Sequence, residues 1–351
     1  MTSSKVFTVG VIGYGLEREF GEDLIEGINW CEAVENPEGE TVKLQAFPVP
    51  ISEVYYRDRP PWDMVIDRSS YLYPFALGMF FHHLYQGVYF VNNPLTFEFW
   101  INHKFLTYSM INSLGIPVPE TYLLPPHSQD GLSQDDIVHH KPFDWKRIEK
   151  DLKFPMVMKP NPGREANNVH FVHNMEELWR TYNGTGKEIM TLQQLVKTPD
   201  SWFVRCICVG RKIIPIKYKF GFNDMSSYIF EENFLEPEIG RKIIEYSKII
   251  NRALGLEMNS IEFMIDSSGT PWAIDFDNPV PDGRRSALGD IYYKDYQSAL
   301  VQLVADVVRT GRKMEFMPSE VNKFNEIARS EAPVEEKFRK ALELAELYYR
   351  D

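Results

Sequence analysis

The sequence predicts an α/β protein that is divided into several domains. The chain has 351 residues, of which 44% are apolar and 25% are charged, whereas single domains usually contain about 100–150 residues. Strand patterns alternate with helical patterns in roughly the first 95 residues, beginning with an apolar strand at 6–12, a Gly-Tyr-Gly turn at 13–15 and a helix from 17 to about 34. This alternation is typical of an open α/β domain.

Composition and charge exclude several classes of function. The chain has 38 Lys and Arg against 50 Asp and Glu, a net charge of −12, so broad nucleic-acid binding, which needs a cationic surface, is not expected. No apolar run approaches the length of a membrane span, and the first residues lack the apolar core of a signal peptide. Three cysteines are too few for a disulfide framework. We therefore expect a cytoplasmic protein without membrane or nucleic-acid partners.

Four units are expected along the chain. The pattern changes near Phe99, where a helix at 101–114 is followed by Gly115 and two prolines. Beyond it, strands near 155–159 and 188–195 indicate one α+β unit, and a second set of strands and helices begins near residue 202. The expected units are an N-terminal α/β domain at 1–98, a central lobe at 99–195, a C-terminal lobe at 196–315 and a helical tail at 316–351.

A hairpin in the C-terminal lobe carries three carboxylates. Two apolar runs, 259–266 and 271–277, are separated by Ser-Ser-Gly-Thr, which predicts a β-hairpin. If the four intervening residues form the loop, Asp266 faces Pro271, and counting outward places Glu262 opposite Asp275 on one face of the hairpin.

Asp277 shares that face with Asp275, because side chains alternate along a strand. Opposed carboxylates destabilise a sheet unless something neutralises them, and Mg²⁺ takes carboxylate oxygens together with substrate phosphates. The hairpin therefore indicates a metal site formed by Glu262, Asp275 and Asp277. A solvated acidic face is the alternative.

Several cations are candidates for holding phosphate. Lys159 ends an apolar strand before a turn-prone Pro-Asn-Pro-Gly segment, an arrangement that can hold phosphate. Lys104 lies in the helix before Gly115, and Arg205 and Lys217 lie in strands expected beside the hairpin. These cations fit either a triphosphate clamp or ordinary surface charges and salt bridges.

The motifs, taken together and in order, resemble those of the ATP-grasp superfamily, which includes glutathione synthetase and D-alanine–D-alanine ligase. The resemblance covers about residues 1–315 and implies an ATP-grasp fold, with ATP held between two α+β lobes behind an N-terminal open α/β domain. It implies that Lys104 and Lys159 contact the phosphates of ATP and that Arg205 lies near the γ-phosphate.

Three further segments take part in the resemblance. Residues 161–168, which include Gly163, match a loop that covers the phosphates. Residues 190–196 match the hinge that reads the adenine edge, with the candidate contacts Gln193, Gln194, Leu195 and Val196. The three hairpin carboxylates match the metal ligands, although the family usually has Glu-x-Asn where this chain has Asp-x-Asp.

The resemblance implies an ATP-dependent carboxylate–amine ligase that acts on small molecules. A carboxylate would attack the γ-phosphate to give an acyl phosphate and ADP, and an amine would then displace phosphate. The cofactors implied are ATP and two Mg²⁺ ions, with Mn²⁺ as the alternative metal. Arg205 would act in catalysis, and Arg284 or Arg285, just past the hairpin, would hold the acceptor carboxylate with a planar guanidinium.

Other functions are kept as alternatives. A kinase of the same fold would phosphorylate a hydroxyl group, and a nucleotide-binding protein of the same fold would do no chemistry. A nicotinamide oxidoreductase is disfavoured, because Gly10, Gly13 and Gly15 do not form the G-x-G-x-x-G turn. Dimers are common in the family, so a homodimer is a further expectation.

Overall fold

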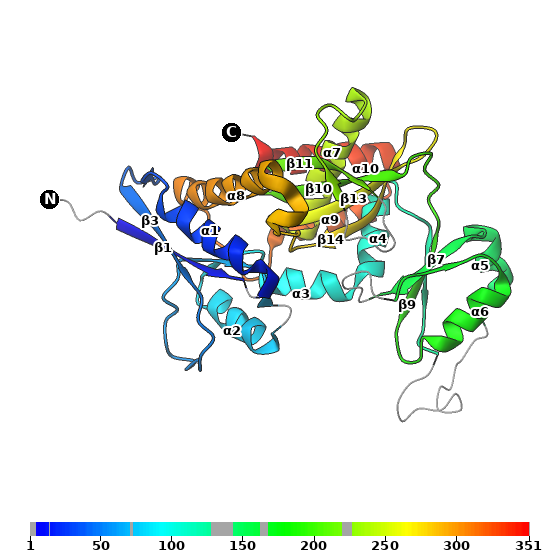
Figure 1. Cartoon of the computed structure of the whole chain (residues 1–351), viewed down its shortest axis with the longest axis horizontal. Coiled ribbons are helices and arrows are strands. Elements are labelled where there is room, and N and C mark those ends of the chain that lie inside the picture. The colour runs from blue at the N-terminus through cyan, green and yellow to red at the C-terminus, as the bar shows by residue number, and fades with distance from the viewer. Residues whose placement is uncertain are drawn as a thin grey trace.

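The structure is a computed structural model that describes residues 5–13, 15–70, 73–127, 143–161, 168–219 and 227–350. Three sheets follow one another along the chain, each partly covered by helices (Figure 1). This mixed α/β architecture confirms the predicted fold class. Within the described residues, no helix combines the length and the apolar character needed to cross a membrane.

The N-terminal domain is an open sheet with the strand order β2-β3-β1-β4-β5. Strands β3, β1, β4 and β5 are parallel to one another, and β2 is antiparallel to β3. Its elements are β1 (Lys5–Ile12), η1 (Gly15–Glu17), α1 (Arg18–Asn29), β2 (Val34–Glu35), β3 (Thr41–Pro48), β4 (Met64–Asp67), α2 (Pro74–Tyr85), β5 (Tyr89–Val91) and α3 (Pro94–Asn102).

The central lobe is an antiparallel sheet with the order β6-β9-β7-β8. Helices α5 and α6 cover one of its faces (Figure 1), where their apolar side chains share a core with those of the strands. Its elements are β6 (Thr121–Leu124), α5 (Trp145–Leu152), β7 (Met156–Pro160), β8 (His170–Val172), α6 (Met175–Gly184) and β9 (Met190–Gln194).

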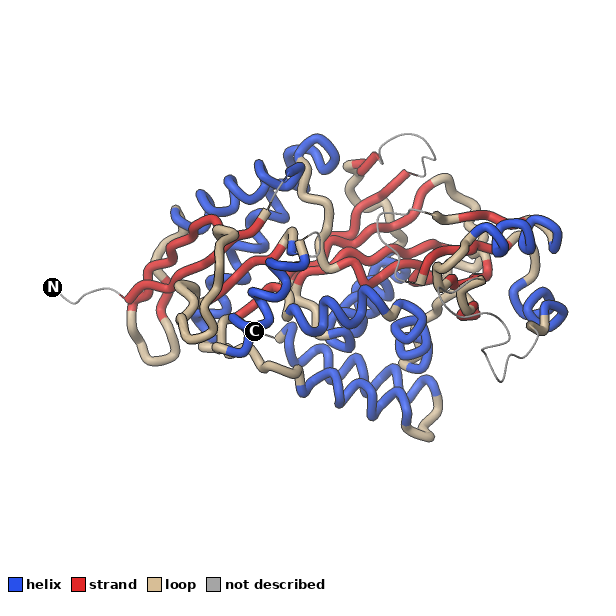
Figure 2. The backbone as a smooth tube through the Cα atoms, turned by 90° about the horizontal axis from the view of Figure 1, so that it is seen from below, coloured by secondary structure: helices blue, strands red, loops and turns tan. Residues whose placement is uncertain are grey.

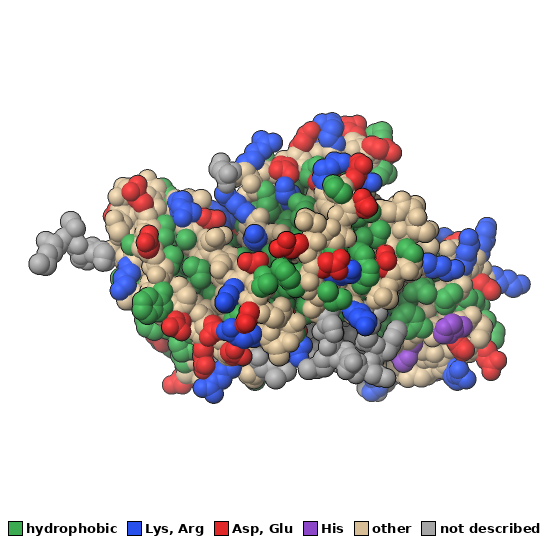
Figure 3. All heavy atoms as spheres, turned by 45° about the horizontal axis from the view of Figure 1, so that its top comes forward, with side chains coloured by type: hydrophobic (Ala, Val, Ile, Leu, Met, Phe, Trp, Pro, Cys, Tyr) green, Lys and Arg blue, Asp and Glu red, His purple; other side chains and the backbone are tan. Residues whose placement is uncertain are grey.

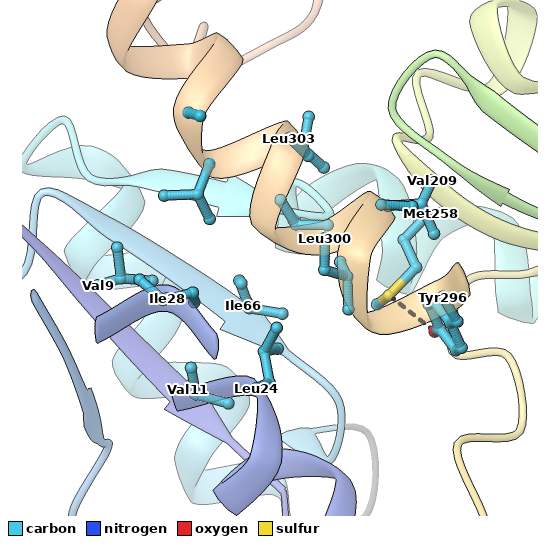
Figure 4. Close-up of a cluster of buried hydrophobic side chains, with 14 of the residues drawn as sticks. Val9, Val11, Leu24, Ile28, Ile66, Val209, Met258, Tyr296, Leu300 and Leu303 are labelled. Carbon is cyan, nitrogen blue, oxygen red and sulfur yellow. Dashed lines mark hydrogen bonds between the residues drawn. The ribbon is translucent and has the colours of Figure 1, made fainter. Parts of the chain in front are cut away.

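The C-terminal lobe is a second antiparallel sheet, ordered β12-β11-β10-β13-β14. Its elements are β10 (Trp202–Val209), β11 (Lys212–Lys219), β12 (Ser227–Ile229), α7 (Pro237–Leu254), β13 (Met258–Ile265), β14 (Pro271–Asn278) and α8 (Arg285–Thr310). Helix α8 lies between this sheet and the N-terminal domain. Leu300 and Leu303 of α8 share one core with Val9 of β1 and Val209 of β10 (Figure 4), so the two units are packed as one body.

The predicted helix at 101–114 is interrupted at His103, where the backbone leaves the helical region, and α4 (Lys104–Ser113) begins there. The sequence assigns this helix to the central lobe, yet its apolar residues lie in the core of the C-terminal lobe together with α7. The tail helices α9 (Ser319–Arg329) and α10 (Val334–Tyr349) join the same core and lie as a pair against one side of the molecule (Figure 2). Helix α4 therefore presents side chains from the C-terminal lobe to the central lobe.

A buried arginine joins the N-terminal domain to the segment that follows β14. Arg68 is 0% exposed, and its Nε lies 2.9 Å from Glu17 Oε2, while its Nη2 donates to the Pro281 carbonyl oxygen at 2.8 Å. A Cβ atom at Gly283 would lie 2.6 Å from this guanidinium. The close approach explains a glycine at that position and fixes the segment that carries Arg284.

Candidate active site

Lys104, the first residue of α4, lies between two carboxylates of β14. Its Nζ is 2.8 Å from Asp275 Oδ1 and 2.9 Å from Asp277 Oδ1, and both Lys104 and Asp277 are at most 5% exposed. Burial opposes the charged ammonium, but the two carboxylates outweigh it and raise the pKa of Lys104. Burial also disfavours the Asp275 carboxylate, yet Lys104 and then Lys159 lower its pKa to about 2. Lys104 and Asp275 therefore hold their charges at neutral pH, whereas burial raises the pKa of Asp277 above its ordinary value.

The hairpin places Glu262 directly opposite Asp275, as predicted. The pairing next to the turn differs from the prediction, because Ile265 rather than Asp266 pairs with Pro271. The register then shifts by one residue near Ile274, where β14 carries a bulge. A bulge inserts one extra residue into a strand, and here it restores the predicted pairing of the two carboxylates.

The carbonyl group of this bulge is bound by the central lobe and by α4. The Ile274 carbonyl oxygen accepts hydrogen bonds from the Tyr108 hydroxyl and from Lys159 Nζ at 3.3 Å. Lys159 Nζ also donates to the Tyr108 hydroxyl oxygen at 2.8 Å. Lys159 is the penultimate residue of β7, so this contact joins the two lobes at the hairpin.

Sequence reasoning missed two residues of α4 that belong to this junction. Thr107 Oγ1 donates to Asp277 Oδ2 at 3.2 Å, and Tyr108 binds Lys159. They follow Lys104 by three and four positions, which places all three on one helix face. That spacing from a candidate lysine was the available signal.

Arg205 lies on β10, the strand that pairs with β13 of the hairpin. Its partner across the sheet is Glu262, with which it forms an ion pair, and its Nη1 donates to the Tyr228 hydroxyl at 2.8 Å. The guanidinium lies 4.0 Å from the ring centroid of Tyr218. Arg205, Glu262 and Asp275 thus occupy one face of the C-terminal sheet.

Lys217, which the sequence made a candidate for binding nucleotide with Arg205, does not join this group. It pairs with Val204 across β10 and β11, and Val204 precedes Arg205, so Lys217 lies on the opposite face of the sheet. There its Nζ is 2.7 Å from Glu231 Oε2 and 4.8 Å from the ring of Trp202. A side chain one position earlier or later on the strand would lie on the opposite face of the sheet.

Arg284 occupies the N-cap position of α8, beside the candidate site. It forms a two-point contact with Asp282, with Nη2–Oδ2 at 2.7 Å and Nε–Oδ1 at 2.9 Å. Arg285 instead extends to the N-terminal domain and pairs with Asp23 at 2.7 Å and Glu19 at 3.0 Å. Arg285 is thus a contact between domains, and Arg284 is the arginine that remains as an acceptor-binding candidate.

The hinge segment lies at the end of β9, on the sheet that carries Lys159. Gln193 is 4% exposed, and its amide donates to Thr121 Oγ1 at 2.8 Å. The Gln194 N–H donates to the Glu120 carbonyl oxygen at 2.9 Å, so this N–H is not available to a base. Leu195 and Val196 follow β9 directly. Gly163, the candidate of the covering loop, lies outside the described residues.

One face of the central sheet is suited to a flat apolar ligand. Met156 and Met158 point to α5 and α6, so Val157 and Lys159 point to the other face. Phe171 pairs with Val157, and Leu123 lies two residues from Thr121, the partner of Gln193. Phe171 and Leu123 remain 39% and 42% exposed. The lysine therefore lies on the same face as these two partly exposed apolar side chains.

The hairpin carboxylates fit a metal that shares its ligands with a substrate. Within the described parts of the chain, no group of three or more His, Cys, Asp or Glu side chains is arranged to hold a metal ion by itself. Glu262 and Asp275 supply two facing carboxylates, and Mg²⁺ characteristically uses one or two carboxylates plus phosphate oxygens. Asp277 is 2% exposed and is bound by Lys104 and Thr107.

The fold is shared with several solved structures, although no family model and no curated protein matches the sequence. The macrocyclase MdnC from Microcystis aeruginosa, bound to its precursor peptide, has a TM-score of 0.59 at 15% identity, with 86% of this chain and 100% of that chain covered. D-alanine–D-alanine ligase from Bacillus anthracis with ATP has a TM-score of 0.56 at 15% identity, with 91% and 99% covered. The ATP-grasp ligase PsnB with Mg and ADP has a TM-score of 0.53 at 13% identity, with 85% and 99% covered.

Charged side chains of both signs are interspersed over the face shown in Figure 3. Three of the candidate cations, Lys104, Arg205 and Arg284, follow the same rule at close range, because each is paired with an acid. The site therefore concentrates charged side chains, and carboxylates neutralise three of its cations by direct pairing.

Proposed function

We propose that this chain, which has the ATP-grasp fold, is an ATP-dependent ligase that joins a carboxylate to an amine. The observation that supports the proposal is the contact between the two lobes at the bulge of β14. There Lys159 of the central lobe contacts the strand that carries Asp275, beside Lys104. Cations from both lobes thus face one strand that bears metal-type ligands.

The cations are suited to the phosphates of ATP. An ammonium group has three N–H donors, and the contacts of Lys104 to the described residues direct two of them to Asp275 and Asp277. The third is left for a phosphate oxygen. Lys159 would contact the same tail from the central lobe, and its apolar neighbours Phe171 and Leu123 would lie under the base or the ribose.

The reaction proposed is phosphoryl transfer followed by amide formation. A substrate carboxylate attacks the γ-phosphorus of ATP, the bond to the β,γ-bridging oxygen breaks, and ADP leaves. An amine then attacks the acyl phosphate carbon, loses a proton and expels phosphate. Phosphoryl transfer is accelerated mainly by positioning and by stabilising charge on the transferred group. Arg205 would supply such stabilisation.

The remaining residues would hold the partners of this reaction. Mg²⁺ would be held by Glu262 and Asp275, with Asp277 as a further ligand, and when bound it neutralises charge on the phosphates. Arg284 would hold the carboxylate of the acceptor in a two-point contact of the same kind as the one that it makes with Asp282. Both substrates can be small molecules or parts of peptides, as the names of the similar ligases illustrate.

An ADP-release screen of carboxylic acids against amines tests the proposal. Hydroxylamine added with the correct acid should trap the acyl phosphate as a hydroxamate while ADP accumulates. AMP with pyrophosphate would refute this mechanism. ADP with a stable phosphorylated hydroxyl product would instead identify a kinase, and nucleotide binding without turnover across the screen would favour a non-catalytic protein.

A further inference from the structure

We propose that the Tyr108 hydroxyl positions Lys159 for nucleotide binding by fastening its ammonium group to the bulge of β14. The role rests on the proposed nucleotide site, but it concerns a residue that sequence reasoning did not select. Tyr108 belongs to α4, whose apolar side lies in the core of the C-terminal lobe. Lys159 belongs to the central lobe, so the contact fixes one lobe against the other.

The contact is a closed triangle of polar atoms. Lys159 Nζ lies 2.8 Å from the Tyr108 hydroxyl oxygen and 3.3 Å from the Ile274 carbonyl oxygen, and the hydroxyl donates its own proton to that carbonyl. The bulge explains why this carbonyl is available, because the local ladder of hydrogen bonds is disrupted there.

Tyr108 is a rigid support for this contact. The residue is 3% exposed, and its ring centroid lies 4.9 Å from that of Phe276, the next residue but one after Ile274. A tyrosine has two side-chain torsions, whereas a lysine has four flexible ones and loses much entropy when its head is fixed. The hydroxyl of the buried tyrosine therefore fixes the ammonium group of Lys159, which the flexible lysine side chain alone would leave mobile.

Neutral partners distinguish Lys159 from the other cations of the site. Lys104, Arg205 and Arg284 are each paired with a carboxylate. Among the described residues, the hydrogen-bond partners of the Lys159 ammonium are a hydroxyl and a carbonyl oxygen. Its charge is thus held in place without being cancelled by direct pairing, and it is available to a phosphate.

The first test needs no nucleotide. The full-length protein and its Tyr108→Phe variant are labelled with an amine-reactive reagent, and the labelling rate of each lysine is measured by mass spectrometry. Phenylalanine keeps the ring that packs on Phe276, and an unchanged thermal midpoint checks the fold. We expect Lys159 to react several-fold faster in the variant. Lys217, which is bound to Glu231, should react at the same rate in both proteins.

The second test measures the affinity for a non-hydrolysable ATP analogue with Mg²⁺ by calorimetry. A hydrogen bond to a charged group typically changes an affinity about 10- to 150-fold, and a positioning contact transmits part of this, so we expect Tyr108→Phe to weaken binding roughly 5- to 20-fold. In a Lys159→Ala background, the same substitution should change the affinity less than about 2-fold, because coupled residues give non-additive effects.

A matched control is available in the central lobe. The Tyr122 hydroxyl lies 2.5 Å from Asp151 Oδ2, on the helix-covered side of the sheet, and Tyr122→Phe should change neither the labelling of Lys159 nor the affinity.

The outcomes separate the two proposals. If the wild type binds the analogue, and Tyr108→Phe leaves both labelling and affinity unchanged, the positioning role is refuted while the nucleotide site stands. Additive losses in the double variant would also refute it, since the hydroxyl would then act independently of Lys159. If the wild type does not bind the analogue, the proposed function fails, and the positioning role fails with it even if labelling is altered.

Discussion

The two faces of the C-terminal sheet differ at the end near Lys104, although the same strands build both. Further along β10, Ile207 and Val209 lie on the same face as Arg205 and are buried in the core with α8. One face carries Arg205, Glu262 and Asp275, close to Lys104. The other carries Val204, Cys206 and Ile261, each 0% exposed, in a core with α7. Adjacent residues on one strand therefore serve different purposes, since one binds charge and the next excludes water.

The difference teaches that a residue's face decides its role more than its type or its distance along the chain. Lys159 and Lys217 are both lysines of predicted strands, and the sequence makes both candidates for binding nucleotide. Lys159 contacts the bulge of β14, whereas Lys217 forms an ion pair with Glu231 on the other face. Substitutions on each face should thus separate nucleotide chemistry from stability.

The largest effect is expected for Asp275→Asn on the charged face. The substitution removes one of two facing carboxylates and the main partner of Lys104, so ATP turnover should be lost in a protein that still folds. Turnover is measured by ADP release once the screen has identified substrates. Asp266→Asn is the matched control, because Asp266 binds Ser268 and Trp272 at the hairpin turn and should retain turnover. Wild-type turnover by Asp275→Asn would remove Asp275 from the proposed metal site.

A smaller effect is expected for Lys159→Ala. Loss of one charge-assisted contact to phosphate costs about 1.5–3 kcal/mol, which is roughly a 10- to 150-fold loss of affinity. Calorimetric titration with a non-hydrolysable ATP analogue and Mg²⁺ measures it. An unchanged dissociation constant would mean that Lys159 serves only the contact between the lobes.

Local patterns were sufficient to predict part of this site. Alternation along two strands joined by a short turn indicated that Glu262 faces Asp275, and the structure has that pairing. The reason assigned was incomplete, because the longer turn and the bulge near Ile274 shift the register in compensating ways. A bulge leaves little trace in a pattern of apolar residues, so counting alone could not reveal it.

Contacts between distant segments were beyond the reach of the same reasoning. Tyr108 meets Ile274 and Lys159 only because α4 packs on the C-terminal lobe while β7 belongs to the central lobe. Its spacing of four residues from Lys104 places it on the same helix face, but that spacing does not reveal its contacts with Ile274 and Lys159. Lys217 shows the converse, since its charge suggested a role beside Arg205, whereas its pairing with Val204 places it on the opposite face of the sheet.

Ile261→Val tests the apolar face next to Glu262. Ile261 is 0% exposed, and removal of one buried methylene typically costs about 0.5–1.5 kcal/mol. Chemical denaturation should show this loss of stability, while the affinity for the ATP analogue should stay within about 2-fold of the wild type. A large loss of affinity would show that the two faces are coupled.

The smallest effect is expected for Lys217→Ala, the matched partner of Lys159→Ala. Lys217 is paired with Glu231 and lies over Trp202, on the face opposite Arg205. A pair of this kind near the surface contributes about 0–1 kcal/mol, so stability should fall slightly, and the affinity for the ATP analogue should not change. Calorimetry on both variants under one set of conditions makes the comparison direct. A loss for Lys217→Ala as large as that for Lys159→Ala would mean that nucleotide reaches the Trp202 face, and the assignment of the two faces would then have to be reversed.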